Sequence, residues 1–231
     1  MIEEVVWDTA FFGRKIGRVL PGTSGTEIGE ALALALKENF SYLTCRLDAA
    51  DIGTVQMLER EGFYLTDFGL VFGRGVEGLE RPPQAARPAT PEDAEAVGKI
   101  AGGLFGTGRF YHDPFFTASE AERLYRVWAE NSVKGAADKV FLIDGEGFVT
   151  CTMSGGEGEV PLIGVSAGSW GKGTGSALML GALAWFRERG AANVKVRTQA
   201  GNLPAIRFYE RLGFRVVSAD ITMGKVLVPP R

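Results

Sequence analysis

The fold of this chain is decided by a glycine-rich turn between an apolar strand-like segment and an amphipathic helical one: Ser169-Trp170-Gly171-Lys172-Gly173-Thr174-Gly175. Glycines permit positive φ angles and bring bare backbone against a ligand. The free N–H groups of such a turn and of the helix start face an anion, and the helix dipole favours its negative charge. The turn therefore predicts a diphosphate site, with a merely flexible loop as the alternative. Its glycine spacing differs from that of a P-loop and from the Gly-x-Gly-x-x-Gly dinucleotide pattern.

A second motif lies downstream, at residues 202–214: Asn202-Leu203-Pro204-Ala205-Ile206-Arg207-Phe208-Tyr209-Glu210-Arg211-Leu212-Gly213-Phe214. Asn202 and Tyr209 are spaced as i and i+7, which places both side chains on one side of a helix. A tyrosine with a pKa near ~10 is protonated at neutral pH, so Tyr209 can donate a proton to a leaving thiolate. The alternative is that Tyr209 is half-buried packing, with Phe208 in the core.

Apolar periodicity around these motifs predicts alternating strands and helices. Helices are expected at about 91–104, 119–133 and 174–189, and a further helix is expected to begin after Asn202 and stop at Gly213. Strands are expected at 140–143, 147–153, 160–165, 194–198 and 214–227. Strands that alternate with helices favour an α/β fold.

The run from 73 to 88 is rich in glycine and proline and is typical of a linker. We therefore expect an N-terminal part at residues 1–74, a linker at residues 75–86 and a C-terminal domain of conventional size at residues 87–231.

The two parts share an internal sequence similarity at a constant offset, in which the second part is an echo of the first. Arg46 and Arg197 are 151 positions apart, and so are Phe63 and Phe214. Both segments predict strand, capping Asp or Asn, helix, glycine and Phe. One interpretation is that the N-terminal part is a partial copy of the C-terminal domain. The other is that any strand–helix–strand unit can end in Gly-Phe, because glycine suits the left-handed position after a helix.

Composition excludes several classes of protein. The 231 residues carry a net charge of −3, which argues against nucleic acid and anionic membranes as partners. No apolar run approaches the ~20 residues that span a bilayer, and the start lacks the layout of a signal peptide. Cys45 and Cys151 lie in apolar contexts, so we expect buried free thiols in a cytoplasmic protein. With His112 as the one histidine, no metal site is expected.

Together the two motifs resemble those of the GCN5-related N-acetyltransferase (GNAT) superfamily, in which an (Arg/Gln)-x-x-Gly-x-(Gly/Ala) turn holds the pyrophosphate of acetyl-CoA. Trp170 stands where that family usually has Arg or Gln. The family's later pattern Asn-x-x-Ala-x-x-x-Tyr-x-x-x-Gly-Phe is matched by Asn202, Ala205, Tyr209, Gly213 and Phe214.

The resemblance implies a GNAT fold, a mixed central sheet flanked by helices, with acetyl-CoA as co-substrate and no metal. It implies that Tyr209 is the general acid and that Asn202 contacts the pantetheine arm. The residues expected to bind acetyl-CoA are Val165, Trp170, Gly171, Lys172, Gly173, Thr174, Gly175, Asn202, Ala205 and Arg211. In the N-terminal part the echo has Leu58 at the position of Tyr209 and has no glycine turn, which predicts one active site per chain.

A narrower resemblance covers nearly the whole chain. Pieces at 10–13, 58–63, 108–111, 125–135 and 197–202 look like those of the dTDP-fucosamine acetyltransferases, which carry a partial GNAT-like N-terminal domain ahead of the catalytic one. This resemblance implies a nucleotide-linked aminosugar, of the dTDP-4-amino-4,6-dideoxy type, as the acceptor in cell-surface polysaccharide biosynthesis.

The loop at 106–116 is the expected acceptor-binding region, with Arg109, Phe110, Tyr111 and His112 as candidate substrate-binding residues. A guanidinium suits a diphosphate, and aromatic rings suit a base or a sugar face. The alternative is that the phenylalanines form a hydrophobic plug and that Arg109 is a solvated surface charge.

The expected reaction is direct attack of a neutral sugar amine on the thioester, in a complex that holds both substrates. Backbone N–H groups near Val165 would polarise the carbonyl, and Glu157 or Glu159 could receive the amine's proton through water. The alternatives are a GNAT enzyme that acetylates another small amine or a protein N-terminus, and a non-catalytic acyl-CoA-binding module. An exposed sheet of the N-terminal part could pack on the catalytic domain or form a homodimer.

Overall fold

The structure is a computed structural model that describes residues 1–20, 22–23, 25–77 and 86–228. The N-terminal half contains β1 (Ile2–Glu4), α1 (Val6–Phe12), β2 (Ile16–Val19), α2 (Gly25–Lys37), β3 (Tyr42–Asp48), α3 (Ile52–Arg60) and β4 (Tyr64–Gly75). The first part of the C-terminal half contains β5 (Arg87–Pro88), the 3-10 helix η1 (Pro91–Asp93), α4 (Ala94–Ala101), α5 (Arg109–His112), α6 (Ala118–Asn131) and the π-helical segment η2 (Ser132–Ala136).

The remainder of the chain contains β6 (Lys139–Ile143), β7 (Gly147–Ser154), β8 (Glu157–Val160), β9 (Ile163–Val165), the 3-10 helix η3 (Ala167–Ser169), α7 (Thr174–Glu188), β10 (Asn193–Gln199), α8 (Leu203–Arg211) and β11 (Arg215–Val226). The predicted helices and strands of this half are therefore confirmed, with one exception described below.

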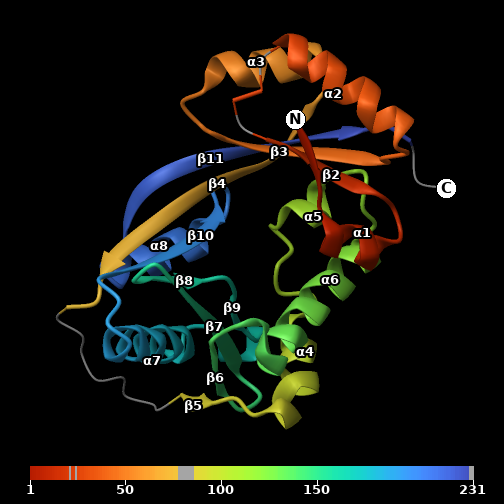
Figure 1. The fold of residues 1–231 in the computed structure, drawn as a ribbon. Coiled ribbons are helices and arrows are strands. Elements are labelled where there is room, and N and C mark those ends of the chain that lie inside the picture. Colours follow the sequence, from red (N-terminus) through yellow and green to blue (C-terminus); the bar gives the residue numbers. More distant parts are fainter. Residues whose placement is uncertain (21, 24, 78–85, 229–231) are drawn as a thin grey trace.

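The described strands form one mixed sheet in the order β1-β2-β3-β11-β4-β10-β8-β7-β6-β5, with β9 paired to β7. Figure 1 shows α2 and α3 on the outer side of β3, and α7 against the strands β6 to β8. The helices α4 and α6 lie along the other side of that part of the sheet, and α5 lies at the upper end of α6, near the N-terminal half. Among the described residues, no helix has both the length and the apolar composition needed to cross a bilayer.

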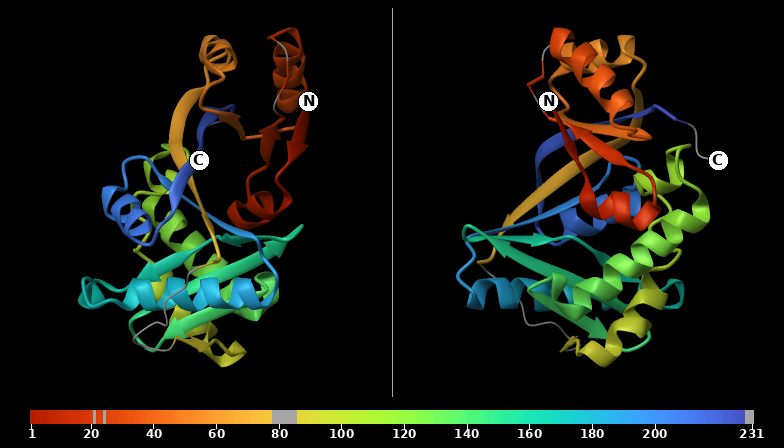
Figure 2. Two further views of the ribbon diagram at one scale, coloured as in Figure 1. Left: turned by 90° about the vertical axis from the view of Figure 1, so that its left-hand side faces the viewer. Right: turned by 45° about the vertical axis from the view of Figure 1, so that its right-hand side comes forward.

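The echo in the sequence corresponds to a repeat in the structure. The bounds of β3, α3 and β4 and those of β10, α8 and β11 coincide after a shift of 151 positions. The last strand of each unit lies inside the other unit, because β11 pairs with both β3 and β4, and β4 pairs with both β11 and β10. The views in Figure 2 show β4 and β11 running together between the two halves. The halves thus share one sheet, and their division into two domains stays a prediction.

The glycine- and proline-rich run from 73 to 88 begins and ends in strands, and the linker predicted at 75–86 overlaps β4 at residue 75. Residues 73–75 belong to β4 and residues 87–88 to β5, whereas residues 78–85 lie outside the described part of the chain. Gly73 pairs with Lys195 on one side and Arg215 on the other. A Cβ at Gly73 would lie 2.9 Å from the Val217 side chain, so this glycine serves close packing between strands and not flexibility.

The single strand predicted at 160–165 was also wrong, because β8 ends at Val160 and β9 begins at Ile163. Pro161 lies between them. Proline has no N–H to donate to a sheet ladder, so the strand cannot continue through it in the same pairing. This break has a direct effect on the candidate active site.

Packing joins the two halves as well. Phe72 of β4 is fully buried and lies in one core with α7, α8 and β10. Both cysteines are buried and free, as predicted. Burial raises the pKa of the Cys45 thiol to about 11, so that this side chain packs as a neutral group.

A glycine substitution tests the shared sheet. Gly69 of β4 lies opposite Asp220, and a Cβ there would lie 2.1 Å from Nη2 of Arg197, whose guanidinium is held by Asp67 and Asp220. We expect Gly69→Ala to lower the free energy of unfolding by about 1–3 kcal/mol in urea denaturation, as overpacking does. The control is Gly29→Ala in α2, where a Cβ meets nothing within 4 Å and should stabilise by about 0.5–1 kcal/mol. A Gly69→Ala variant as stable as the unmodified chain would contradict the packing described.

Candidate active site

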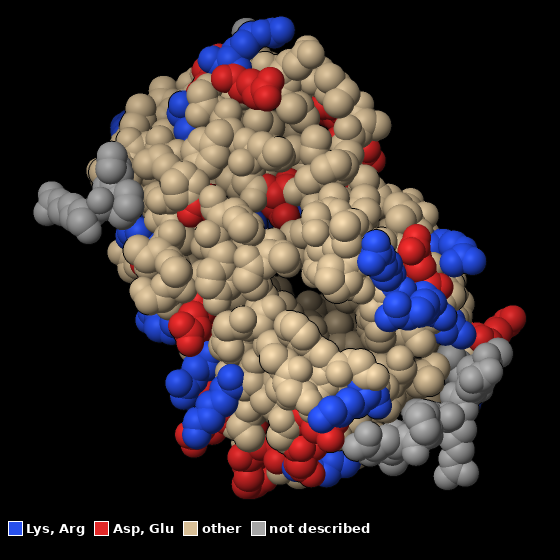
Figure 3. All heavy atoms as spheres, turned by 180° about the vertical axis from the view of Figure 1, so that it is seen from behind, with Lys and Arg blue, Asp and Glu red and all other residues tan. Residues whose placement is uncertain are grey.

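The break at Pro161 opens a gap between two parallel strands. β8 and β10 pair from Glu157 opposite Asn193 to Val160 opposite Val196. Beyond that point β9 pairs with β7, whereas β10 continues alongside β4. A cavity of about 820 Å³ begins in this gap and extends between the two halves of the molecule. Figure 3 shows the hollow between the halves.

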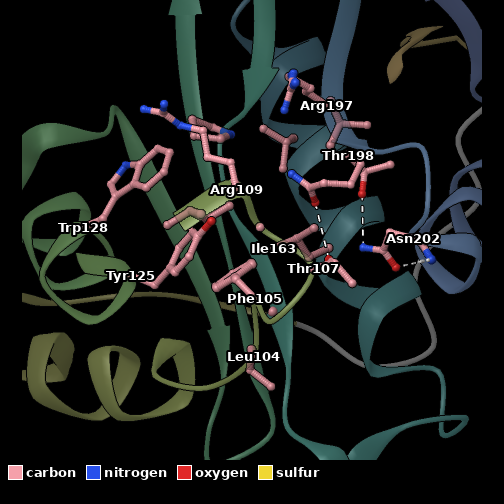
Figure 4. A pocket seen from close by; sticks show the side chains of 18 of the residues that line it. Leu104, Phe105, Thr107, Arg109, Tyr125, Trp128, Ile163, Arg197, Thr198 and Asn202 are labelled. Atoms are coloured by element: carbon pink, nitrogen blue, oxygen red, sulfur yellow. Dashed lines mark hydrogen bonds between the residues drawn. The ribbon is translucent and has the colours of Figure 1, made fainter. Parts of the chain in front are cut away.

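The walls of the cavity differ in character. Figure 4 shows Phe105, Tyr125 and Trp128 on one side, and Thr198 and Asn202 on the other. The N-terminal half contributes to the wall as well, with the apolar residues Val5 and Trp7 and with the charged residues Asp8, Arg18, Arg46 and Asp67. Among the described residues, no group of three or more His, Cys, Asp and Glu side chains is arranged to hold a metal ion.

The glycine turn has the predicted backbone. Gly171 and Gly173 have φ angles of +75° and +89°. α7 begins without a side-chain cap, because its N-cap residue is Gly173, and the hydroxyl of the first helical residue, Thr174, donates to Glu146 at 2.6 Å. Within the described residues, the backbone N–H groups from Gly171 to Gly175 donate to no intramolecular acceptor. Several donors therefore point from one helix start, as an anion requires.

The cavity reaches this turn at its two ends. Trp170, Gly175 and the preceding Val165 line the cavity, whereas Gly171, Lys172, Gly173 and Thr174 do not. The Trp170 indole donates to the backbone carbonyl of Val165 at 2.8 Å, which closes the turn over the end of β9. The tryptophan therefore has a structural role at the position where the family usually has Arg or Gln.

The second motif forms α8. Asn202 caps it as predicted: its amide oxygen accepts from the Ala205 N–H at 3.3 Å, and its amide nitrogen donates to the Thr198 hydroxyl at 3.1 Å. Asn202, Ala205 and Tyr209 all line the cavity, so the helix face inferred from their spacing is confirmed. Arg211 is exposed and is not part of the cavity wall, because it follows Tyr209 by two residues and so points about 200° away from it around the helix axis.

Tyr209 lies at the inner end of the cavity. Its side chain is 4 % exposed and is packed among the rings of Phe72, Phe208 and Phe214. Burial raises the pKa of the phenol above its ordinary value, because a phenolate would be desolvated there. The group is therefore protonated at neutral pH and beyond it, as a proton donor requires.

The 106–116 segment contains the short helix α5, and the predicted acceptor residues separate around it. Arg109 and Phe110 line the cavity, whereas Tyr111 and His112 do not. Tyr111 stacks on Tyr125, and His112 is exposed. Successive residues of a helix point about 100° apart, so four in a row cannot face one cavity. Tyr111 and His112 therefore lie outside the cavity wall, contrary to their predicted place beside the acceptor.

The two interpretations of this segment each hold in part. Phe110, Phe115 and Phe116 are buried in one cluster, as a plug would be. Arg109, however, is not a solvated surface charge: its side chain is 16 % exposed, it donates to the Thr44 hydroxyl at 3.3 Å, and it lies 3.8 Å from Asp8.

Sequence reasoning missed the charged residues at the far end of the cavity. Arg197 donates from Nη1 to Asp67 and from Nε to Asp220, each at 2.8 Å, and so joins β10 to β4 and β11. Arg46 and Asp67 come from the N-terminal half. The only available signal was the echo, which aligns Arg46 with Arg197.

Comparison with known proteins gives this geometry a context. Residues 102–214 match the Acetyltransferase (GNAT) family. The chain is 28 % identical to dTDP-fucosamine acetyltransferase from Escherichia coli, over 94 % of each chain. It is 23 % identical to the spore coat polysaccharide biosynthesis protein SpsD from Bacillus subtilis, over 93 % of this chain and 78 % of that one. A GCN5-related N-acetyltransferase from Sphaerobacter thermophilus superposes with a TM-score of 0.65 at 16 % identity, over 94 % of this chain and 74 % of that one, which shows a shared fold.

The two ends of α7 offer a matched test of the glycine turn. Gly173 precedes the helix with φ +89°, and Gly190 follows it with φ +79°; a Cβ meets nothing within 4 Å at either. Alanine should therefore introduce similar backbone strain at both positions, about 1–2 kcal/mol. We expect only Gly173→Ala to weaken coenzyme A binding, about tenfold in isothermal titration, because only that end presents N–H groups to a diphosphate. Equal losses of affinity in both variants would contradict a specific site at the turn.

Proposed function

Because this chain carries an acetyltransferase domain of the GNAT family and is an N-acetyltransferase, we propose that its acceptor is the amine of a nucleotide-linked aminosugar of the dTDP-4-amino-4,6-dideoxy type. The observation that carries the proposal is the composition of the cavity beyond Tyr209, where arginines lie beside exposed aromatic rings. Guanidinium groups bind phosphates in bidentate fashion, and aromatic faces stack on bases and sugars. Two relatives that align over most of the chain are named for an aminosugar substrate and for polysaccharide biosynthesis, which supports the same class of acceptor.

The residues present fit acetyl-CoA as the co-substrate. The free N–H groups from Gly171 to Gly175 suit its diphosphate, and the gap between β9 and β10 suits an extended arm. Asn202 keeps one amide hydrogen after donating to Thr198, so it can still donate to a ligand in the gap. Acetyl-CoA would supply an acetyl group activated as a thioester.

The chemistry that the chain must perform is a transfer between two bound substrates. The neutral amine nitrogen forms a bond to the thioester carbonyl carbon, and the carbon–sulfur bond breaks. Tyr209 donates its proton to the departing sulfur and regains one from water. The amine loses a proton through water to a carboxylate of the wall. Of the two glutamates considered for that role, Glu159 lines the cavity, whereas Glu157 is paired with Lys195 outside it.

Much of the rate enhancement in this account comes from position. The glycine turn holds one substrate and the wall beyond Tyr209 holds the other, so that their reacting atoms meet at the phenol. Exclusion of water by the surrounding phenylalanines keeps the phenol neutral and strengthens its contact with developing negative charge.

The acceptor class is tested by mixing the full chain with acetyl-CoA and a panel of amines, and following the release of free thiol. The panel contains dTDP-linked and UDP-linked aminosugars, the corresponding free aminosugars, a polyamine and a peptide with a free N-terminus. We expect release with the dTDP-linked 4-amino-4,6-dideoxy sugars and not with the polyamine or the peptide. Release with only the non-sugar amines would contradict the proposal and favour a different acceptor.

A second prediction concerns Tyr209. The variant Tyr209→Phe keeps the ring that packs on Phe72 and removes the proton donor. We expect kcat to fall about 10²–10⁴-fold, the range for loss of a general acid. The dissociation constant for acetyl-CoA should change by less than about threefold, because the substitution removes an interaction made only in the transition state. The contacts that bind acetyl-CoA before the reaction stay the same.

The pH dependence follows from the same burial. Because the pKa of Tyr209 is raised, its active protonated form persists above pH 10, and kcat should not decline through phenol ionisation below that point.

The control for the Tyr209→Phe variant is Tyr111→Phe, which removes a phenol outside the cavity wall and should leave kcat unchanged. Unchanged turnover in Tyr209→Phe would refute the acid assignment.

A further inference from the structure

The repeat places two arginines at equivalent positions with different surroundings. Arg46 of β3 and Arg197 of β10 are 151 positions apart, and both line the cavity. Arg197 is clamped between Asp67 and Asp220 at 2.8 Å each, and its side chain is 20 % exposed. Its charge is therefore compensated within the chain.

Arg46 has no such clamp. By the same shift of 151 positions, Ser218 and Gly69 stand where the repeat would supply carboxylates to Arg46. Within the described residues, the one carboxylate within 4.0 Å of Arg46 is Asp220, at 3.7 Å, and Asp220 already accepts from Arg197. The side chain of Arg46 is 53 % exposed, in the cavity that it lines.

The neighbours of Arg46 add positive charge. Arg18 of β2 pairs in register with Thr44 of β3, two residues before Arg46 and on the same face of the strand. Among the described residues, no carboxylate lies within 4.0 Å of Arg18. Arg109 donates to that same Thr44. Burial lowers the pKa of Arg46 below its ordinary value, and the charges of Arg197 and Arg109 lower it further, against the opposing charges of Asp220 and Asp67.

Asp8 and Asp67, which line the cavity near Arg46, already form ion pairs with other arginines. Asp8 lies against Arg109, and Asp67 is bound by Arg197. Glu159 also lines the cavity, from β8, and forms no ion pair with Arg46 or Arg18 in the described structure. Two guanidinium groups that face a cavity without close carboxylates of their own are suited to an anionic ligand.

We propose that Arg46, together with Arg18, binds the diphosphate of the nucleotide-linked acceptor, so that the N-terminal half supplies the acceptor's anion site. This inference rests on the proposed sugar-nucleotide function. The chain then has two separate diphosphate sites. The start of α7 serves the acetyl donor through backbone N–H groups, and the β2–β3 face serves the acceptor through guanidinium groups. Each substrate enters from its own side, and their reactive ends meet near Tyr209.

The proposed diphosphate subsite at Arg46 and Arg18 is tested by measuring the binding of dTDP to the full chain in isothermal titration. Saturating coenzyme A is present, so that the glycine turn is filled. We expect Arg46→Ala to raise the dissociation constant for dTDP at least tenfold and Arg18→Ala to raise it by a smaller factor. The matched control is Arg60→Ala, an exposed arginine of α3 outside the cavity, which should bind dTDP like the unmodified chain. Unchanged affinity of all three variants for coenzyme A shows that the fold is intact.

The kinetic arm separates this inference from the proposed function. With a dTDP-linked aminosugar, Arg46→Ala should raise KM for the nucleotide sugar and leave KM for the free aminosugar unchanged. If no nucleotide sugar is acetylated but dTDP still binds in an Arg46-dependent way, the proposed function fails and the subsite stands. If dTDP fails to bind the unmodified chain, or binds Arg46→Ala and Arg60→Ala equally, the subsite is overturned even where transfer occurs.

Discussion

The antiparallel ladder between β4 and β11 is the constraint on which the rest of the structure depends. Each of these strands leaves its own half and fills a place between strands of the other half. Without this exchange, both units would expose unpaired strand edges. The exchange also carries Phe72 against Tyr209 and brings Asp67 to Arg197, so that the core and the wall of the cavity are built from both ends of the chain.

The two copies of the repeat have the same strand–helix–strand fold, but they contribute different side chains to the cavity. Asp51 caps α3 through the Thr54 N–H just as Asn202 caps α8, so the helix start is retained in both. The counterpart of Tyr209 is Leu58, which is fully buried in the N-terminal core. In the described structure, only the C-terminal copy therefore combines a phenol with the cavity. The N-terminal copy supplies two charged side chains, Arg46 and Asp67, to that same cavity instead.

Local signals in the sequence were sufficient for the elements around the two motifs. The cap at Asn202 and the glycine stop at Gly213 predicted α8, and the helical spacing correctly placed Tyr209 on the cavity face, because capping and periodicity depend on near neighbours. The residues that pair with β4 lie 118 (Gly75 and Asn193) to 160 (Tyr64 and Gly224) positions away in the sequence, and no local pattern encodes such pairing. For that reason Gly73 suggested a linker although it is in mid-sheet, and Arg46 was overlooked as a cavity residue.

The central claim is that one cavity between the exchanged halves holds both substrates, the donor along the glycine turn and the acceptor against the N-terminal half. The most direct measurement is a crystal structure of the full chain with coenzyme A and dTDP bound together. The account predicts the pantetheine arm between β9 and β10, its thiol next to the Tyr209 hydroxyl, and the dTDP diphosphate in contact with Arg46. Coenzyme A outside that gap, or dTDP bound away from the β2–β3 face, would contradict it.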